Sequence, residues 1–103
     1  MEPRNPITKE QIQRALRGRH SAGVQDKLDH ARVAVAGLGG LGSNVAFALA
    51  RIGVGHLHLI DFDRVDLANL NRQQYFLRHL GMYKTDALKE ELLQINPYLD
   101  IRT

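Results

Sequence analysis

A glycine-rich segment, residues 37–43 (Gly-Leu-Gly-Gly-Leu-Gly-Ser), constrains the fold of this chain more than any other feature. It directly follows Val33-Ala34-Val35-Ala36, a short apolar run that is typical of a buried parallel strand. Beyond it, apolar residues recur at helical spacing up to Ile52, and Gly53 is suited to a left-handed helix end. A strand, a glycine turn and a helix in this order predict the opening unit of a nucleotide-binding α/β fold.

Three of these glycines, Gly37, Gly39 and Gly42, fit the pattern G-x-G-x-x-G. The first permits a tight turn out of the strand, and the second lets the backbone approach a phosphate closely. The third lets the helix lie against the strand. Free N–H groups at the helix start would then face the anion, so the loop is predicted to bind a phosphate.

The elements that follow predict a parallel sheet. Residues 57–60 read as a second strand, and helices are expected at 73–80 and 84–95, the latter ended by Asn96-Pro97. Residues 98–102 read as a third strand, where the chain stops. Strand, helix, strand, helix, strand is the order of a Rossmann-like α/β fold, here truncated after its third strand.

Two short helices are expected before this fold. Thr8 and Gln11 have the spacing of a capping box, and Ser21 can cap a second helix. We therefore divide the chain into an N-terminal helical arm, residues 1–32, and the first half of a Rossmann-like domain, residues 33–103. The net charge of +3 lies in the arm, which suits either contact with an anion or a solvated helix face.

Composition excludes several classes of function. The 103 residues contain no cysteine, which excludes disulfides, a thiolate zinc site and a cysteine nucleophile within this chain. No membrane-length apolar run, no signal-peptide core and no basic stripe with interleaved aromatics is visible, so we expect a cytoplasmic protein that binds neither membranes nor nucleic acid. His56 and His58 share one strand face but lack a third ligand, so no metal site is predicted.

Asp61 lies 19 residues after Gly42, at the end of the second predicted strand. A carboxylate at that distance accepts hydrogen bonds from the hydroxyls of a ribose. NAD and ATP both carry an adenosine ribose, so this pattern fits a dehydrogenase and an ATP-binding enzyme equally well.

Two cations further along the chain favour ATP. Arg72 lies in a polar segment, and Lys84 follows twelve residues later at the start of a predicted helix. Arginine offers a planar fork of donors and lysine a point charge, a pair that suits a triphosphate better than a pyrophosphate already held by backbone amides.

Taken in order, five motifs resemble the ThiF/MoeB/HesA adenylyltransferases, relatives of the ubiquitin-activating enzymes. These motifs are the glycine loop, Asp61-Phe62-Asp63, residues 69–73 (Asn-Leu-Asn-Arg-Gln), residues 81–84 (Gly-Met-Tyr-Lys) and residues 95–97 (Ile-Asn-Pro). The match covers about residues 32–103. Arg19-His20-Ser21, residues 24–28 and residues 43–46 look most like the short ThiF branch, which activates a sulfur carrier for thiamine synthesis.

The resemblance implies an activity and a set of site residues. Such enzymes use ATP and Mg²⁺ to adenylate the C-terminal glycine of a ubiquitin-like carrier (here a ThiS-like sulfur carrier), releasing pyrophosphate, and commonly act as homodimers. If the family's residue roles apply at the matching positions, the loop and Gly40 within it would wrap the nucleotide, and Asp61 would hold the ribose. The phosphates would be bound by Asn69, Arg72, Gln73 and Lys84, with Arg72 and Lys84 catalytic and Asp63 adjacent.

The chain also departs from the family pattern. Members commonly carry Arg-Tyr-x-Arg-Gln near the N-terminus, whereas this chain has Arg17-Gly18-Arg19-His20, so Arg14, Arg17 and Arg19 are candidates for an arginine that reaches a partner subunit. The family's magnesium-associated aspartate and its carrier groove lie on later segments, so we expect these 103 residues alone to be inactive. Two other interpretations stay open: a NAD-binding domain of an oxidoreductase, and a non-catalytic nucleotide-binding or dimerisation module.

Overall fold

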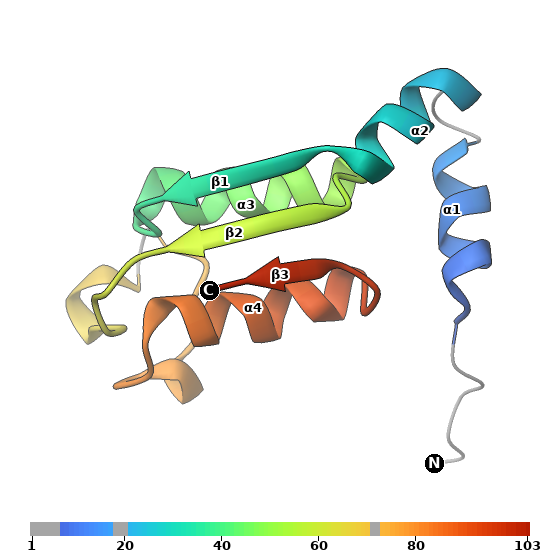
Figure 1. The fold of residues 1–103 in the computed structure, drawn as a ribbon. Helices are drawn as coiled ribbons and strands as arrows, with labels where there is room; N and C mark the ends of the chain where they lie inside the picture. The colour runs from blue at the N-terminus through green and yellow to red at the C-terminus, as the bar shows by residue number, and fades with distance from the viewer. Residues whose placement is uncertain (1–6, 18–20, 71–72) are drawn as a thin grey trace, which may run out of the picture.

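Three short parallel strands lie side by side in the order β1-β2-β3, in a computed structural model that describes residues 7–17, 21–70 and 73–103. They are β1 (Arg32–Ala36), β2 (His56–Ile60) and β3 (Asp100–Arg102). Helix α3 (Gly40–Ile52) connects β1 to β2, and helix α4 (Lys84–Ile95) precedes β3 (Figure 1). The predicted α/β class and element order are therefore confirmed.

Burial differs between the two faces of the sheet. Residues that alternate along the strands, such as Val35, Leu59 and Ile101, are buried against α3 and α4. Their neighbours Ala34, His58 and Arg102 lie on the opposite face and are exposed. The hydrophobic core therefore lies in one layer between the sheet and its two helices, with Leu38, Ala46, Ala50, Leu57, Ala87, Leu88 and Leu92 among its members.

Both long helices begin and end as their sequences predict. Gly53 adopts a left-handed conformation (φ 106°), and its N–H donates to the carbonyls of Leu49 and Ala50. Helix α4 covers the predicted residues, and the Asn96 N–H bonds back to Leu92.

The N-terminal arm contains α1 (Lys9–Arg17) and α2 (Ala22–His30). Thr8 and Gln11 form the predicted capping box, each side chain accepting a hydrogen bond from the other residue's N–H, and Ser21 caps α2. Figure 1 shows α1 beyond the end of the sheet where the strands begin, and there Tyr98 donates a hydrogen bond to the Ile7 carbonyl (2.5 Å). Among the described helices, none combines the length and the apolar character needed to span a membrane.

Two predicted elements are wrong in extent. The helix expected at 73–80 is replaced by a single 3-10 turn, Leu77–His79, because the preceding residues make hydrogen bonds to α3 and to the glycine loop. The third strand begins at Asp100 rather than Tyr98, since the Asn96 side chain accepts from the Tyr98 N–H and closes a turn.

Candidate functional site

The glycine loop joins β1 to α3 in the manner that its spacing predicts. Gly37 has a positive φ of 85°, and its N–H donates to the Ile60 carbonyl (2.8 Å). A Cβ on Gly42 would lie 1.7 Å from the Gly37 carbonyl oxygen, so only glycine permits this contact between helix and strand. The first and third glycines therefore have the structural roles predicted for them.

Backbone N–H groups at the start of α3 have no acceptor among the described residues. Gly39 is the N-cap residue, and none of the described residues accepts a hydrogen bond from its N–H or from those of Gly40, Leu41 and Gly42. The Leu41 side chain is 81% exposed, so this helix start opens to solvent. Free N–H groups at a helix N-terminus, together with the helix dipole, form an anion-binding site.

The Asp61 carboxylate lies against this loop. Its Oδ2 accepts from the Leu38 N–H (2.7 Å), and its Oδ1 accepts from the Asp63 N–H (2.8 Å). The side chain is half-buried, and each oxygen keeps a further lone pair. Asp61 therefore joins the end of β2 to the glycine loop and retains acceptor capacity there, while Phe62 beside it is 89% exposed.

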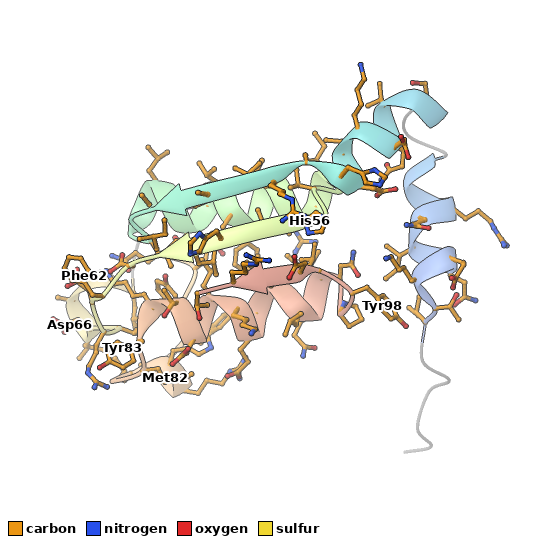
Figure 2. All side chains as sticks on the ribbon, viewed as in Figure 1. His56, Phe62, Asp66, Met82, Tyr83 and Tyr98 are labelled. Atoms are coloured by element: carbon orange, nitrogen blue, oxygen red, sulfur yellow. The ribbon has the colours of Figure 1, made fainter. Side chains whose placement is uncertain are left out.

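Lys84 is brought to the same end of the sheet by backbone pairing. The Lys84 N–H donates to the Asp63 carbonyl (2.9 Å), and the Val65 N–H donates to the Met82 carbonyl (2.8 Å). Arg64 reinforces this pairing by donating to the Gly81 carbonyl (2.7 Å), with its guanidinium 4.1 Å from the centre of the Tyr83 ring. Figure 2 shows Phe62, Asp66, Met82 and Tyr83 gathered at this end, with His56 and Tyr98 at the other.

The lysine itself is 6% exposed and begins α4. No described residue forms an ion pair or hydrogen bond with its ammonium group, and the Asp63 carboxylate likewise accepts none from the described residues. A buried cation without a partner is costly in a folded protein. This ammonium group is therefore available to an anionic ligand.

The remaining predicted phosphate contacts are only partly described. Asn69 ends the 3-10 turn Leu67–Asn69, and Arg72 lies outside the described residues. The Gln73 side chain reaches the glycine loop, where its Nε2 would be 3.8 Å from a Cβ on Gly39, and its Oε1 is buried without a described partner. Of the arginines considered for the partner subunit, Arg14 is exposed on α1 and Arg19 lies outside the described residues.

Three residues of this site were missed by the sequence analysis. Ser43 is fully buried, and its hydroxyl donates to the Gly39 carbonyl (2.5 Å) and accepts from the Gln74 N–H (3.3 Å). The Tyr75 hydroxyl donates to the Leu38 carbonyl (2.7 Å). A polar run that ends in tyrosine, Asn-Arg-Gln-Gln-Tyr, is the only signal that could have indicated these contacts.

Tyr75 and its neighbour Phe76 differ in burial. Tyr75 is 4% exposed and belongs to the core, against which Met82 also packs, whereas Phe76 is 57% exposed. The turn leaves the Phe76 ring outside because the Phe76 N–H bonds to Nδ1 of buried His79.

Histidines and acids form two clusters outside the glycine loop. Among the described residues, His79, Glu90 and Glu91 are the only group with metal-ligand spacing, but the Arg78 guanidinium already binds both carboxylates. At the far end of the sheet, Nδ1 of His56 lies 2.7 Å from Oδ2 of Asp100. This hydrogen bond lowers the pKa of the Asp100 carboxyl, with help from the charges of Arg102 and Arg32.

Comparison with known proteins gives a consistent result. The sequence model of the ThiF family matches residues 9–103. The chain is 41% identical over 76 residues to ubiquitin-like modifier-activating enzyme 5 of Caenorhabditis elegans (74% of this chain, 18% of that protein). It is 45% identical over 80 residues to molybdopterin-synthase adenylyltransferase of Haemophilus influenzae (77% of this chain, 33% of that protein).

Comparison with solved structures gives the same result as comparison of sequences. Escherichia coli tRNA N6-threonylcarbamoyladenosine dehydratase superposes with a TM-score of 0.84 at 33% identity, covering 94% of this chain and 41% of that one. The same enzyme in complex with ATP gives a TM-score of 0.83 at 35% identity, covering 95% and 42%. The chain thus spans less than half the length of these relatives.

Proposed function

The chain belongs to the ThiF family, and we propose that it is the ATP-binding part of an adenylyltransferase. Its parent would activate the C-terminal glycine carboxylate of a ubiquitin-like sulfur carrier as an acyl-adenylate and release pyrophosphate. The observation that supports this most lies at one end of the sheet, where four N–H groups and the Lys84 ammonium have no partner among the described residues and the Asp61 carboxylate lies beside them.

Adenylation of a carboxylate requires groups that stabilise negative charge. A carrier carboxylate oxygen attacks the α-phosphorus, a new bond forms between that oxygen and phosphorus, and the bond from phosphorus to the pyrophosphate oxygen breaks. The reaction brings anions together, so preorganised N–H dipoles and a positioned cation stabilise the charge that develops. In this proposal the N–H groups of residues 39–42 and Lys84 hold the phosphates, and Asp61 orients the ribose.

Magnesium would arrive with the triphosphate. Mg²⁺ is usually held by one or two carboxylates together with substrate phosphates. The exposed Asp63 carboxylate, which no described residue engages, has the hard oxygen donors that this ion prefers. When bound, the ion would supply charge neutralisation of the phosphates, while the residues of this chain would bind and orient the nucleotide.

The carrier, the pathway and the assembly rest on the motif resemblance. A ThiS-like carrier, a role in thiamine synthesis and a homodimer are our proposals, and the cytoplasmic location and the role of Arg72 stay predictions. Named relatives act in several pathways, including those of molybdopterin and of tRNA modification.

Calorimetry with ATP plus Mg²⁺ and, separately, with NAD tests the nucleotide. We expect binding of ATP and no binding of NAD. Charge-assisted hydrogen bonds contribute about 1.5–3 kcal/mol, so Lys84→Met, which keeps the buried stem, should weaken ATP binding roughly ten- to hundredfold. Lys89→Met on the same helix is the matched control and should leave ATP binding unchanged. Tight NAD binding without ATP binding would instead support the oxidoreductase alternative.

A further inference from the structure

The peptide groups of Leu38 are held from both sides in the middle of the glycine loop. The Leu38 N–H donates to Asp61 Oδ2, and the Leu38 carbonyl accepts from the Tyr75 hydroxyl, each at 2.7 Å. The Leu38 side chain is fully buried. Both peptide groups that flank the Leu38 Cα are therefore hydrogen-bonded to side chains.

The carbonyl contact sets the direction of the next donor. Within a planar trans peptide the C=O and the following N–H point in opposite directions, and no described peptide is cis. Because Tyr75 holds the Leu38 carbonyl, the Gly39 N–H points to the side away from Tyr75. No described residue accepts a hydrogen bond from that N–H, so it is left for a ligand.

Tyr75 is itself firmly placed. Its ring meets the ring of His79 edge-on, with centroids 6.1 Å apart, and His79 is anchored by the Phe76 N–H (2.8 Å) and lies 3.1 Å from Glu91 of α4. Burial raises the pKa of the Tyr75 hydroxyl, and the charge of Asp61 acts in the same direction. The hydroxyl therefore stays protonated and remains a donor.

A second side-chain contact holds the next peptide unit, Gly39–Gly40. The Ser43 hydroxyl accepts from the Gln74 N–H and donates to the Gly39 carbonyl. Two successive loop carbonyls therefore accept hydrogen bonds: that of Leu38 from the Tyr75 hydroxyl, and that of Gly39 from the Ser43 hydroxyl, which Gln74 in turn contacts. These contacts explain why residues 73–76 are irregular rather than helical.

We propose that Tyr75 is a positioning residue for the phosphate-binding loop, whose hydroxyl orients the Leu38–Gly39 peptide so that the Gly39 N–H faces a nucleotide phosphate. The inference rests on the proposed binding of ATP. It assigns to Tyr75 no contact with the nucleotide.

The test is the conservative variant Tyr75→Phe, with Tyr98→Phe as its matched control. Each removes one hydroxyl that donates to a backbone carbonyl, but the Tyr98 hydroxyl lies at the opposite end of the sheet. Loss of one such hydrogen bond should weaken ATP binding roughly three- to tenfold in Tyr75→Phe. Binding of adenosine, followed by NMR titration, should change less than about twofold, because adenosine has no phosphate for the Gly39 N–H. Tyr98→Phe should leave both affinities unchanged.

Unchanged ATP affinity in Tyr75→Phe, or an equal loss for ATP and adenosine, would overturn the proposal. The second result would show that the hydroxyl serves stability alone. In the unaltered chain, ATP should shift the Gly39 amide resonance more than that of Gly55. A Gly39 resonance that does not shift when ATP binds would also refute the proposal. If ATP does not bind at all, the proposed function fails. The orientation of the peptide is then judged from the nucleotide-free chain, where Tyr75→Phe should displace the Gly39 resonance and Tyr98→Phe should not.

Discussion

At the end of the sheet where the strands begin, polar groups bind one another, whereas at the end where the strands finish, several donors have no partner in the described part of the chain. At the first end the Gly55 N–H donates to the Leu28 carbonyl, the Asp100 N–H donates to the Gly55 carbonyl, and His56 pairs with Asp100. At the second end the N–H groups of residues 39–42 and the Lys84 ammonium have no described partner.

Both ends nevertheless use a glycine for close backbone contact. A Cβ on Gly42 would lie 1.7 Å from the Gly37 carbonyl oxygen, and one on Gly55 would lie 2.1 Å from that of Asp29. Glycine therefore marks tight packing at either end. What distinguishes the candidate binding site from the closed turn is that its backbone donors have no acceptor among the residues that the structure describes.

The largest expected effect is on these two glycines. Gly42→Ala and Gly55→Ala each force backbone atoms apart, so each should lower the free energy of unfolding by about 3 kcal/mol. Gly23→Ala is the control, because a Cβ there meets nothing within 4 Å, and alanine within a helix should stabilise by roughly 0.5–1 kcal/mol. Urea unfolding followed by circular dichroism measures all three. Wild-type stability in either tight variant would show that the backbone relaxes there without cost.

A smaller effect is expected from the two aspartates. Asp61→Asn leaves one oxygen for two N–H donors, so one of those donors loses its partner and stability should fall by about 1 kcal/mol. Asp100→Asn alters an exposed pair at the closed end, and its free energy of unfolding should not change measurably. If urea unfolding gave an equal loss of stability for Asp61→Asn and Asp100→Asn, the proposed difference between the two ends of the sheet would be contradicted.

The smallest effect is electrostatic. The folded-state pKa of Asp100 is lowered, chiefly by the hydrogen bond from His56, so the pair favours the folded state above the ordinary carboxyl pKa, by an amount too small for urea unfolding to resolve. That contribution is lost as the pH falls through the lower folded value. His56→Ala should raise the pKa of Asp100 toward its ordinary value, as measured by NMR titration of the carboxyl carbon. ATP binding should not respond, and a change in ATP affinity would indicate that the two ends are coupled.

Local chemistry explains which elements could be predicted. The caps of Thr8, Ser21 and Gly53 and the fit of Gly42 against Gly37 involve residues at most five positions apart in the chain. The bounds of α4 likewise follow from its own pattern of apolar residues and from Asn96-Pro97. Such short-range rules can be applied without knowing how distant residues pack.

The errors arise where distant residues compete with local preference. Residues 73–80 have a helical pattern, but Gln74 bonds to Ser43, 31 positions earlier, and Tyr75 to Leu38, 37 positions earlier. Hydrogen bonds to Ser43 and to the Leu38 carbonyl replace those of a helix, so residues 73–76 are irregular and only Leu77–His79 form a 3-10 turn.

The candidate site divides in the same way. From the sequence alone came the phosphate loop, the acid after the second strand and the lysine at the head of a helix, because each is defined by its distance from a strand or helix end. Only the tertiary structure decided that the Asp61 carboxylate would accept a hydrogen bond from Leu38, 23 positions away. It also decided that residues 63–65 would pair with residues 82–84, which leaves the Lys84 ammonium without a described partner. Sequence spacing specifies turns and helix ends, whereas the pairing of polar groups depends on which surfaces the packed core brings together.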